Sequence, residues 1–454
     1  MSGDSLTLGI AGLQNAYGSG EHTPEGVLDA LFAAIDADTR HINAFCLLDR
    51  EDARAAALAS GARWREGRPL GPLDGVPVSI KDLMNVAGWP TRRGSRSSAG
   101  DPPAAQDSPA VALLRAAGCV IFGKTTTTEF GWNTSSWNPH SGLTRNPLDP
   151  LRSAGGSSSG AAAQAAAGWG PLALGSDAGG SVRIPASYCG VVGFKPSFGA
   201  IPLAPQSAFA EFAHLGPLTR SVEDCRQAMA VLSQADARDP GSLFIRGGAV
   251  QRGPVRIGWT LQLGADMQVE PAISDAFLAA LEQLERAGHT LVPMPAEGTD
   301  LASDMWTVWL SRVHESFLAW QPGQRLLLDA RLQALYEEGN ALELAQLARS
   351  RARLRDFAMR LAQQFASVDL MLTPATPSVA PAIAKDGSAD INWFAGNGYA
   401  YPFNLTQQPA LSIPLGRNAD GLPFGLQIVG RRYDDARVLA FGEEVEALLS
   451  GSAA

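Results

Sequence analysis

The chain of 454 residues has little cysteine and no excess of positive charge. Its cysteines are widely spaced and form no C-x-x-C pair, so we expect reduced thiols and an interior without disulfides. Lys and Arg number 36 against 45 Asp and Glu, which gives a net charge of −9. That balance argues against a nucleic-acid-binding surface, although a local basic patch stays open. The four cysteines are Cys46, Cys119, Cys189 and Cys225.

Long apolar runs are missing as well. No uncharged apolar run approaches the roughly 20 residues of a membrane-spanning helix, so we expect no membrane association. The first residues, MSGDSLTLGI, lack both a basic and a long apolar segment, so we expect no secretory signal and a cytoplasmic protein. The composition that is present, 45% hydrophobic and 18% charged, is that of an ordinary globular protein with a large core.

Small residues are concentrated between residues 155 and 197. This segment holds the serine run Ser157-Ser158-Ser159 between glycines, an alanine-rich run that predicts a helix, and Asp177-Ala178-Gly179-Gly180-Ser181 after a short apolar piece. Serines beside glycines have uncovered backbone N–H groups near the hydroxyl, which is what stabilisation of an oxyanion requires. A flexible Gly/Ser/Ala linker is the alternative, and the recurring apolar residues argue against it.

The segment resembles the amidase signature family of serine hydrolases, which cleave amides through a Ser–cis-Ser–Lys triad. GGSSSG, a small-residue helix and GSDAGGSVRIPASYCGVVGFKPS follow one another at the spacing of that family. The resemblance implies that Ser181 is the nucleophile, that Ser157 is the bridging serine, and that the peptide bond between Gly156 and Ser157 is cis. It also implies an oxyanion hole made by the backbone N–H groups of Ala178, Gly179, Gly180 and Ser181.

The lysine of the triad is assigned by the same resemblance. The segment GVPVSIKDL reads as a short buried strand with a charge at its end, and it matches the catalytic-lysine strand of the family, so the role falls to Lys81. A lysine that reaches from a strand end to water is the alternative interpretation. As the base, Lys81 must be uncharged, and burial lowers the pKa of a lysine in that direction. The chemistry implies no metal and no cofactor.

Other parts of the site follow from the resemblance too. Residues 125–150 are rich in turn formers, and in the family the part around Gly131 and Trp132 approaches the substrate carbonyl, so we expect these two residues and Ser158 to bind substrate. Packing in the core is the alternative for Trp132. Asp177 and Arg183 bracket the loop that contains Ser181, which we call the second serine loop, and we expect them to support that loop.

The substrate is left open by the sequence. Aliphatic, aryl, carbamoyl and peptide amides all fit the motifs, because the helical region 301–365 that shapes the pocket varies within the family. Its aromatic residues, and those near 393–403, favour a hydrophobic or aryl substrate, although core packing explains any one of them equally well. These aromatic residues are Trp306, Trp309, Trp320, Tyr336, Trp393, Phe394, Tyr399, Tyr401 and Phe403.

One motif points elsewhere. The segment GCVIFGKT, from Gly118 to Thr125, satisfies the G-x-x-x-x-G-K-[ST] pattern of phosphate-binding loops. In a true phosphate loop the strand precedes the first glycine, whereas here the residues Cys119 to Phe122 between the two glycines read as the strand. We therefore expect no nucleotide site.

A Ser-His-Asp hydrolase is a second alternative. The segment from Gly156 to Gly160 fits G-x-S-x-G, which would make Ser158 the nucleophile, with His214, His289 or His314 as the base. That motif requires a strand just before it, and residues 145–152 contain two prolines and read as a loop.

A third alternative stays within the family. Glutamine-hydrolysing subunits of tRNA-dependent amidotransferases share the signature and work with partner subunits. They hold the glutamine amino group with an acidic residue before the C-terminal pair of strands, and no acid occurs here between Asp390 and Asp420. A non-catalytic member would lack part of the triad, and all three residues are present.

The usual form in the family implies a homodimer acting on a small-molecule amide.

The remaining chain predicts an α/β fold. Thr23-Pro24-Glu25 predicts a helix start, and alternation of helices and strands implies βα units in a parallel or mixed sheet. Phe198 to Arg220 reads as a loop. With the resemblance, we expect one domain over residues 1–454, an α/β/α arrangement with a central twisted mixed sheet, a core at about 71–430 and N-terminal helices in 1–70. Helices are predicted at 51–66, 109–117, from Ser221, 272–287 and through 301–365, and strands at 76–83, 119–122, 255–259, 290–293, 369–374, 409–415 and 424–429.

Overall fold

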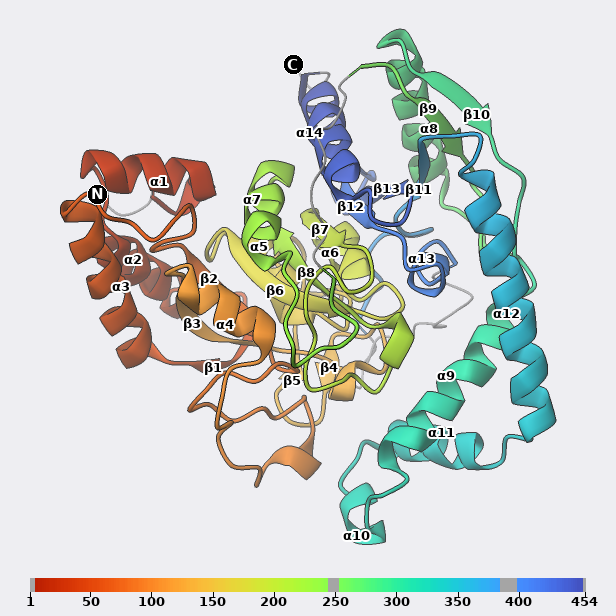
Figure 1. Cartoon of the computed structure of the whole chain (residues 1–454), viewed down its shortest axis with the longest axis horizontal. Coiled ribbons are helices and arrows are strands. Elements are labelled where there is room, and N and C mark those ends of the chain that lie inside the picture. The colour runs from red at the N-terminus through yellow and green to blue at the C-terminus, as the bar shows by residue number, and fades with distance from the viewer. Residues whose placement is uncertain (1–4, 244–252, 384–397, 452–454) are drawn as a thin grey trace.

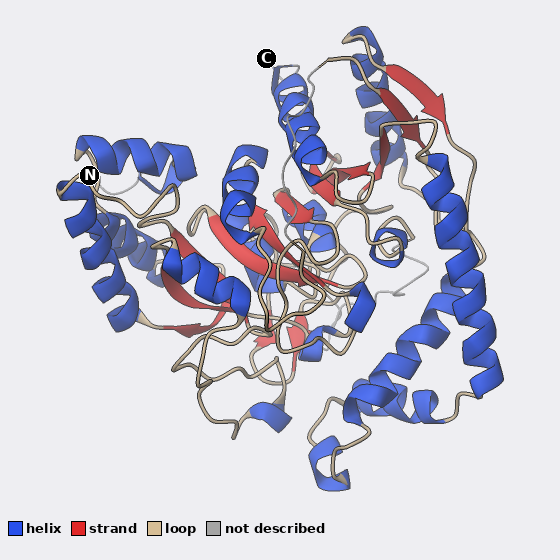
Figure 2. Ribbon diagram, viewed as in Figure 1, coloured by secondary structure: helices blue, strands red, loops and turns tan. Residues whose placement is uncertain are grey.

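A mixed sheet of eleven strands runs through the molecule, and helices cover both of its faces (Figures 1 and 2). The computed structural model describes residues 5–243, 253–383 and 398–451. The strand order is β1-β3-β2-β6-β8-β7-β12-β13-β11-β9-β10, and β4 with β5 forms a separate ribbon. The strands β3, β2 and β6 are parallel, whereas β8, β7, β12 and β13 pair in antiparallel fashion. The expected central mixed sheet between helical layers is therefore confirmed.

The bounds of the elements follow. The strands are β1 (Phe45–Leu48), β2 (Pro77–Lys81), β3 (Val120–Thr125), β4 (Trp137–Asn138), β5 (Gly142–Leu143), β6 (Leu172–Asp177), β7 (Val192–Lys195), β8 (His214–Thr219), β9 (Arg256–Trp259), β10 (Thr290–Pro293), β11 (Leu370–Pro374), β12 (Ala410–Arg417) and β13 (Pro423–Gly430). The helices are α1 (Ile10–Ser19), α2 (Pro24–Asp36), α3 (Arg50–Arg65), α4 (Pro109–Ala116), α5 (Ser159–Ala167), α6 (Arg183–Cys189), α7 (Val222–Leu232), α8 (Pro271–Arg286), α9 (Ala302–Phe317), α10 (Pro322–Arg325), α11 (Ala330–Asn340), α12 (Leu344–Gln364), α13 (Pro402–Leu405) and α14 (Asp435–Gly451).

Capping residues explain where helices begin. The Thr23 side chain accepts a hydrogen bond from Gly26 N at 3.2 Å, and Pro24 occupies the first position of α2. Ser221 accepts in the same way from Asp224 N at the start of α7. Each side chain satisfies one of the N–H groups that a helix leaves without an internal partner. Both predicted starts are confirmed.

Side chains that alternate along β2 and β6 show which helices pack on each face of the sheet. Leu172 and Leu174 pack into one apolar core with α4, α7, α8 and α14, whereas Ala173 packs into a second core with α5 and α6. In β2, Ile80 belongs to the first core, and Ser79 faces α5 through a hydrogen bond to Gln164. Since side chains alternate along a strand, Lys81 faces the same side as Ser79 and reaches the layer that carries the serine run.

The helical region 301–365 forms a layer of its own. Helices α9, α11 and α12 pack against one another along the lower right of Figure 1, outside the sheet. Nearly all of this region is helical, as predicted. It carries a third apolar core with Trp309, Phe317 and Phe357, which also includes Trp132. No helix of the described part of the chain is long and apolar enough to cross a membrane.

The prediction of a loop from Phe198 to Arg220 is wrong for its last part. His214–Thr219 is β8, a fully buried strand between β6 and β7. Proline is unfavourable in strands because it cannot donate a hydrogen bond to the neighbouring strand, so Gly216 and Pro217 do not read as part of a strand in the sequence. Pairing with other strands outweighs this low strand propensity. Strand β8 pairs with β6 over its whole length, whereas β7 pairs only with Leu218 and Thr219.

Candidate active site

Lys81 is the last residue of β2, and it is fully buried. Its Nζ lies 2.7 Å from Ser157 Oγ, 3.0 Å from Ser158 Oγ and 3.0 Å from Ser176 Oγ. Burial lowers the pKa of the Lys81 amine well below its usual value, and the negative charge of Asp177 acts in the opposite direction. No carboxylate of the described residues lies within 4 Å of this amine, because Asp177 is paired with Arg183 instead.

The serine run is fixed by its glycines and by α5. A Cβ on residue 156 would lie 2.1 Å from the Ser135 carbonyl oxygen, so only glycine fits there. The Gly156–Ser157 peptide bond is cis, as the family resemblance implies. Ser158 occupies the N-cap position of α5, although its side chain makes no capping hydrogen bond. The run is joined to the second serine loop by a hydrogen bond from Ser158 N to the Ser181 carbonyl oxygen at 3.1 Å.

The second serine loop is organised around a buried ion pair. Asp177 ends β6, and its carboxylate accepts hydrogen bonds from Gly180 N at 2.8 Å and Val182 N at 3.1 Å. It also accepts from Arg183 Nη2 at 2.9 Å and Arg183 Nε at 3.0 Å, which makes the ion pair bidentate, and from Asn404 Nδ2 at 2.9 Å. Burial alone would raise the pKa of Asp177, but the charges of Arg183 and Lys195 and several hydrogen bonds hold it below its usual value.

The loop presents backbone donors beside Ser181. Of the four predicted oxyanion donors, the N–H of Gly180 is already engaged, because it donates to the Asp177 carboxylate. The N–H groups of Ala178, Gly179 and Ser181 have no partner among the hydrogen bonds of the described residues. Backbone N–H groups without a partner beside a serine hydroxyl are the donors that binding of an oxyanion requires.

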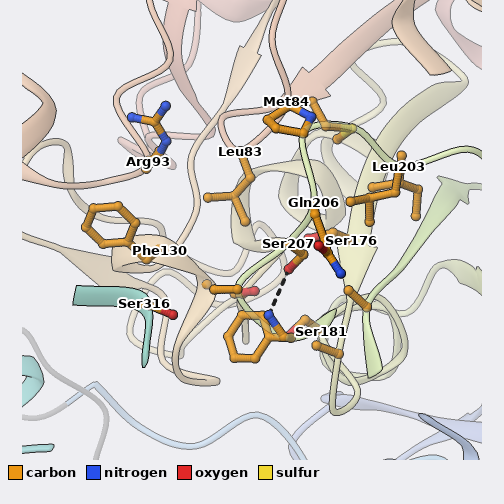
Figure 3. Close-up of a pocket in the computed structure, with 18 of the residues that line it drawn as sticks. Leu83, Met84, Arg93, Phe130, Ser176, Ser181, Leu203, Gln206, Ser207 and Ser316 are labelled. Atoms are coloured by element: carbon orange, nitrogen blue, oxygen red, sulfur yellow. Dashed lines mark hydrogen bonds between the residues drawn. The ribbon is translucent and has the colours of Figure 1, made fainter. Parts of the chain in front are cut away.

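Ser157 and Ser181 both line one cavity of about 350 Å³. Figure 3 shows Ser181 at its base, Leu83 and Phe130 on one side and Leu203 on the other. Of the residues expected to bind substrate, Gly131 and Trp132 line the cavity, whereas Ser158 is not among its lining residues, and neither is Lys81. Trp132 is also packed against Trp309 and Phe209, so it is both a core and a site residue, and its indole N–H has no partner among the described residues.

The three triad candidates are brought together, but one contact is missing. Lys81 is hydrogen-bonded to Ser157, and Ser157 lines the cavity with Ser181. A hydrogen bond between the hydroxyls of Ser157 and Ser181 is not among those of the described residues. Catalytic hydrogen bonds are often long without substrate and shorten in the complex.

Several lining residues were missed at the level of sequence. One wall is the segment 203–209, which ends at Phe209, and another is the end of α9 with Phe317 and Trp320. Among the described aromatic residues of 301–365 that were expected to shape the pocket, only Trp320 lines the cavity. Trp309 packs against Trp132, and Tyr336 stacks on His314. The aromatic content of 301–320 was the available signal. Trp393 and Phe394 lie outside the described residues.

Two alternatives find no support in the geometry. Gly118 ends α4 and residues 120–125 are β3, so the phosphate-loop pattern is a buried strand whose Lys124 pairs with Asp82 at 2.7 Å. Ser158 Oγ contacts Lys81 and Ser176, whereas His289 pairs with Glu444, His314 stacks on Tyr336 and His214 bonds to the Phe212 carbonyl. Among the described residues, no cluster of three or more His, Cys, Asp or Glu side chains could hold a metal.

Comparison with known proteins agrees with the geometry. The profile of the Amidase family matches residues 26–439. The chain is 33% identical over 446 residues to an acylamidase of Rhodococcus erythropolis, covering 94% of this chain and 92% of the relative. It is 33% identical over 469 residues to a glutamyl-tRNA(Gln) amidotransferase subunit of Chloroflexus aggregans, covering 96% and 95%. The structure of a bacterial aryl acylamidase superposes with a TM-score of 0.88 at 27% identity, covering 98% and 97%.

Proposed function

Since the chain belongs to the amidase signature family and is an amide-hydrolysing enzyme, we propose that it works through Lys81, Ser157 and Ser181. The observation that carries this assignment is the buried Lys81 amine at 2.7 Å from Ser157 Oγ, next to a cavity that Ser157 shares with Ser181. A serine is a weak nucleophile at neutral pH without an adjacent base. An uncharged lysine within hydrogen-bond distance supplies one.

The proposed reaction has two halves. Ser181 Oγ forms a bond to the amide carbon while its proton passes to Ser157 and the Ser157 proton passes to Lys81. The carbonyl oxygen gains the negative charge, which the N–H groups of Ala178, Gly179 and Ser181 stabilise. The C–N bond then breaks, the proton returns through Ser157 to the amine, and an acyl-enzyme is left. Water attacks the ester in the second half by the same proton path, which releases the acid and restores Ser181.

For the substrate we propose an uncharged amide with a hydrophobic or aryl group. Five aromatic side chains line the cavity, and they supply large apolar contact surfaces. The two charged side chains that also line it are both engaged within the protein: Asp177 with Arg183, and Arg93 with Asp101 at 2.7 Å. The aromatic lining residues are Phe130, Trp132, Phe209, Phe317 and Trp320.

Glutamine hydrolysis within an amidotransferase complex is the second candidate. It is favoured by the relative from Chloroflexus aggregans. A free amino acid carries an ammonium and a carboxylate, and burying them requires charged partners. No acid is present between Asp390 and Asp420, and the charges at the described cavity are already paired, so amide hydrolysis without partner subunits is the better supported function.

We also propose one amidase domain over residues 1–454, a homodimer and a cytoplasmic location. One sheet containing strands from Phe45 to Gly430 supports a single domain. The four cysteines are free thiols, which is typical of proteins in reducing compartments.

A substrate panel with trapping of the acyl-enzyme tests the function. Aryl, aliphatic, carbamoyl and peptide amides and glutamine are each incubated with the full chain and with Ser181→Ala, and the acyl adduct is detected by intact mass. We expect turnover of neutral aryl or hydrophobic amides and an adduct that disappears in Ser181→Ala. Ser159→Ala is the matched control, because Ser159 is buried and its hydroxyl has no partner among the described residues. Turnover that survives in Ser181→Ala contradicts the assignment, and turnover confined to glutamine selects the second candidate.

A further inference from the structure

The Lys81 amine has more polar neighbours than the proposed mechanism uses. Besides Ser157 Oγ, it lies 3.0 Å from Ser158 Oγ, 3.0 Å from Ser176 Oγ and 3.4 Å from the Ser176 carbonyl oxygen. An uncharged amine carries two N–H donors and one lone pair. Catalysis requires that the lone pair face Ser157, so the question is which groups take the two N–H donors.

The hydroxyl of Ser158 can only accept from Lys81. Its own proton goes to the Ser176 carbonyl oxygen at 3.1 Å, because a carbonyl can act only as an acceptor. Its oxygen also accepts the Ser176 N–H at 3.3 Å. One lone pair is left on this oxygen, and Lys81 Nζ at 3.0 Å fills it with an N–H. Ser158 is thus fully satisfied and fixes one N–H of the amine.

Ser176 is placed to take the second N–H. Its Oγ lies at 3.0 Å from Nζ, nearer than its carbonyl at 3.4 Å, which already accepts from Ser158. Ser176 is half-buried and lines the cavity, so its own hydroxyl proton has room to point there. The remaining neighbour, Ser157 Oγ, is the closest of the four at 2.7 Å.

We infer that Ser158 and Ser176 are positioning residues that hold the two N–H bonds of Lys81 and so aim its lone pair at the Ser157 hydroxyl. This rests on the proposed function of Lys81 as an uncharged base. In the proton transfer, the Ser157 O–H bond breaks, its proton binds the lone pair to give an ammonium, and Ser157 Oγ takes the proton of Ser181. The new ammonium then donates to Ser157, Ser158 and Ser176, so the same acceptors stabilise the charge that forms.

The charges around Lys81 are few, which makes its titration informative. Asp177 at the end of β6 is the charged group that acts on it, and Arg183 pairs with Asp177. Asp82, the residue directly after Lys81, pairs with Lys124 on the neighbouring strand β3. Helix α5, SGAAAQAAA, carries no charged residue.

The test compares Ser158→Ala, Ser176→Ala and Ser176→Thr with the control Ser159→Ala in the full chain, with acylation followed before the steady state at several pH values. We expect acylation to fall on the order of tenfold in both alanine variants, and Ser176→Thr to restore most of it because the hydroxyl is kept. The acid limb of the rate profile should move to lower pH, because an ammonium loses more than an amine when an acceptor is removed.

The controls separate this inference from the proposed function. Added to Lys81→Met, neither alanine change should lower the rate further, since there is no amine left to orient. Acylation by Lys81→Met at the wild-type rate contradicts the proposed base itself. Loss of activity in Lys81→Met, together with Ser158→Ala and Ser176→Ala acting like Ser159→Ala, overturns only the positioning role. An acid limb that moves to higher pH indicates water entering the site and also overturns it. If Ser158→Ala does not fold, the Ser176→Ala and Ser176→Thr pair decides.

Discussion

Arg183 holds Asp177 by two parallel hydrogen bonds, 2.9 and 3.0 Å long, between two side chains that are both fully buried. The remaining donors of Arg183 reach the Ala400 carbonyl at 2.9 Å, Gln427 Oε1 at 2.7 Å and Asn404 Oδ1 at 2.7 Å. Asp177 in turn accepts from two backbone N–H groups of the serine loop. The pair therefore ties the loop of Ser181 to α13 and β13 and leaves neither charge unmatched.

Breaking this pair should destabilise the protein strongly. Arg183→Met leaves the buried Asp177 carboxylate without its cation, and the free energy of unfolding should fall by about 3–5 kcal/mol. The control is Arg68→Ala, whose ion pair with Glu66 is exposed and should change stability by at most about 0.5 kcal/mol. Urea denaturation of both variants makes the comparison. Equal effects would show that the buried pair does not hold the loop.

The rate of acylation should rise with pH and then level off. The base is active when Lys81 is uncharged, and burial keeps the pKa of its amine well below the usual value, so the limb should lie well below the pH at which an exposed lysine titrates. Lys81→Arg should be inactive at every accessible pH, because arginine stays protonated in proteins. The pH profile of kcat/KM for both proteins checks this. A limb at the ordinary pKa of lysine contradicts an uncharged base.

Glu129 should make stability fall as the pH rises. Its carboxylate is buried and accepts hydrogen bonds from Ser95 Oγ at 2.5 Å and Asp329 N at 2.9 Å. Burial raises its pKa from 4.5 to about 7. Between these two values the folded protein binds more protons than the unfolded chain, so the free energy of unfolding decreases with increasing pH.

Glu129→Gln is the matched variant for this effect. It keeps an acceptor and removes the titration, so its stability relative to wild type should rise from pH 5 to pH 8. Urea denaturation at intervals of pH measures the difference. A constant difference across the range would show that Glu129 does not titrate there.

Trp320 should determine affinity for aryl substrates. It follows α9 in sequence and lines the cavity with an apolar ring that takes no part in the proposed proton transfers, so we expect its contacts to act equally on substrate and transition state. Trp320→Ala should raise KM for a neutral aryl amide about tenfold and leave kcat nearly unchanged. Leu318→Ala is the control, since Leu318 is 61% exposed and does not line the cavity. A loss confined to kcat would assign Trp320 a different role.

Nucleotides should not bind, despite the phosphate-loop pattern. Lys124 is buried and paired with Asp82, so its ammonium cannot reach a phosphate. Magnesium ATP should leave the Tm unchanged. A non-hydrolysable analogue of an aryl amide that the enzyme hydrolyses should raise the Tm. A rise in Tm with ATP contradicts this interpretation of the motif.

Much of the fold could be predicted, and the failures have identifiable causes. Capping residues indicate the starts of α2 and α7, and the apolar runs indicate β2, β11, β12 and β13. These signals are local, because they depend on residues a few positions apart. The strand β8 escaped prediction because Gly216 and Pro217 are poor strand formers, and only pairing along β6 makes them a strand.

The site divides in the same way. The proposed roles of Lys81, Ser157 and Ser181 came from the sequence, through the family resemblance. That resemblance rests on linear patterns: a serine run between glycines, a GGS loop and a lysine that ends an apolar strand. Only the tertiary structure decided what surrounds them: that Ser158 faces Lys81 instead of the cavity, that Asp177 occupies the N–H of Gly180, and that Phe209 and Phe317 complete the pocket. The reason is physical: hydrogen-bond partners and burial depend on which segments the sheet and its helices bring together, and no local pattern records that.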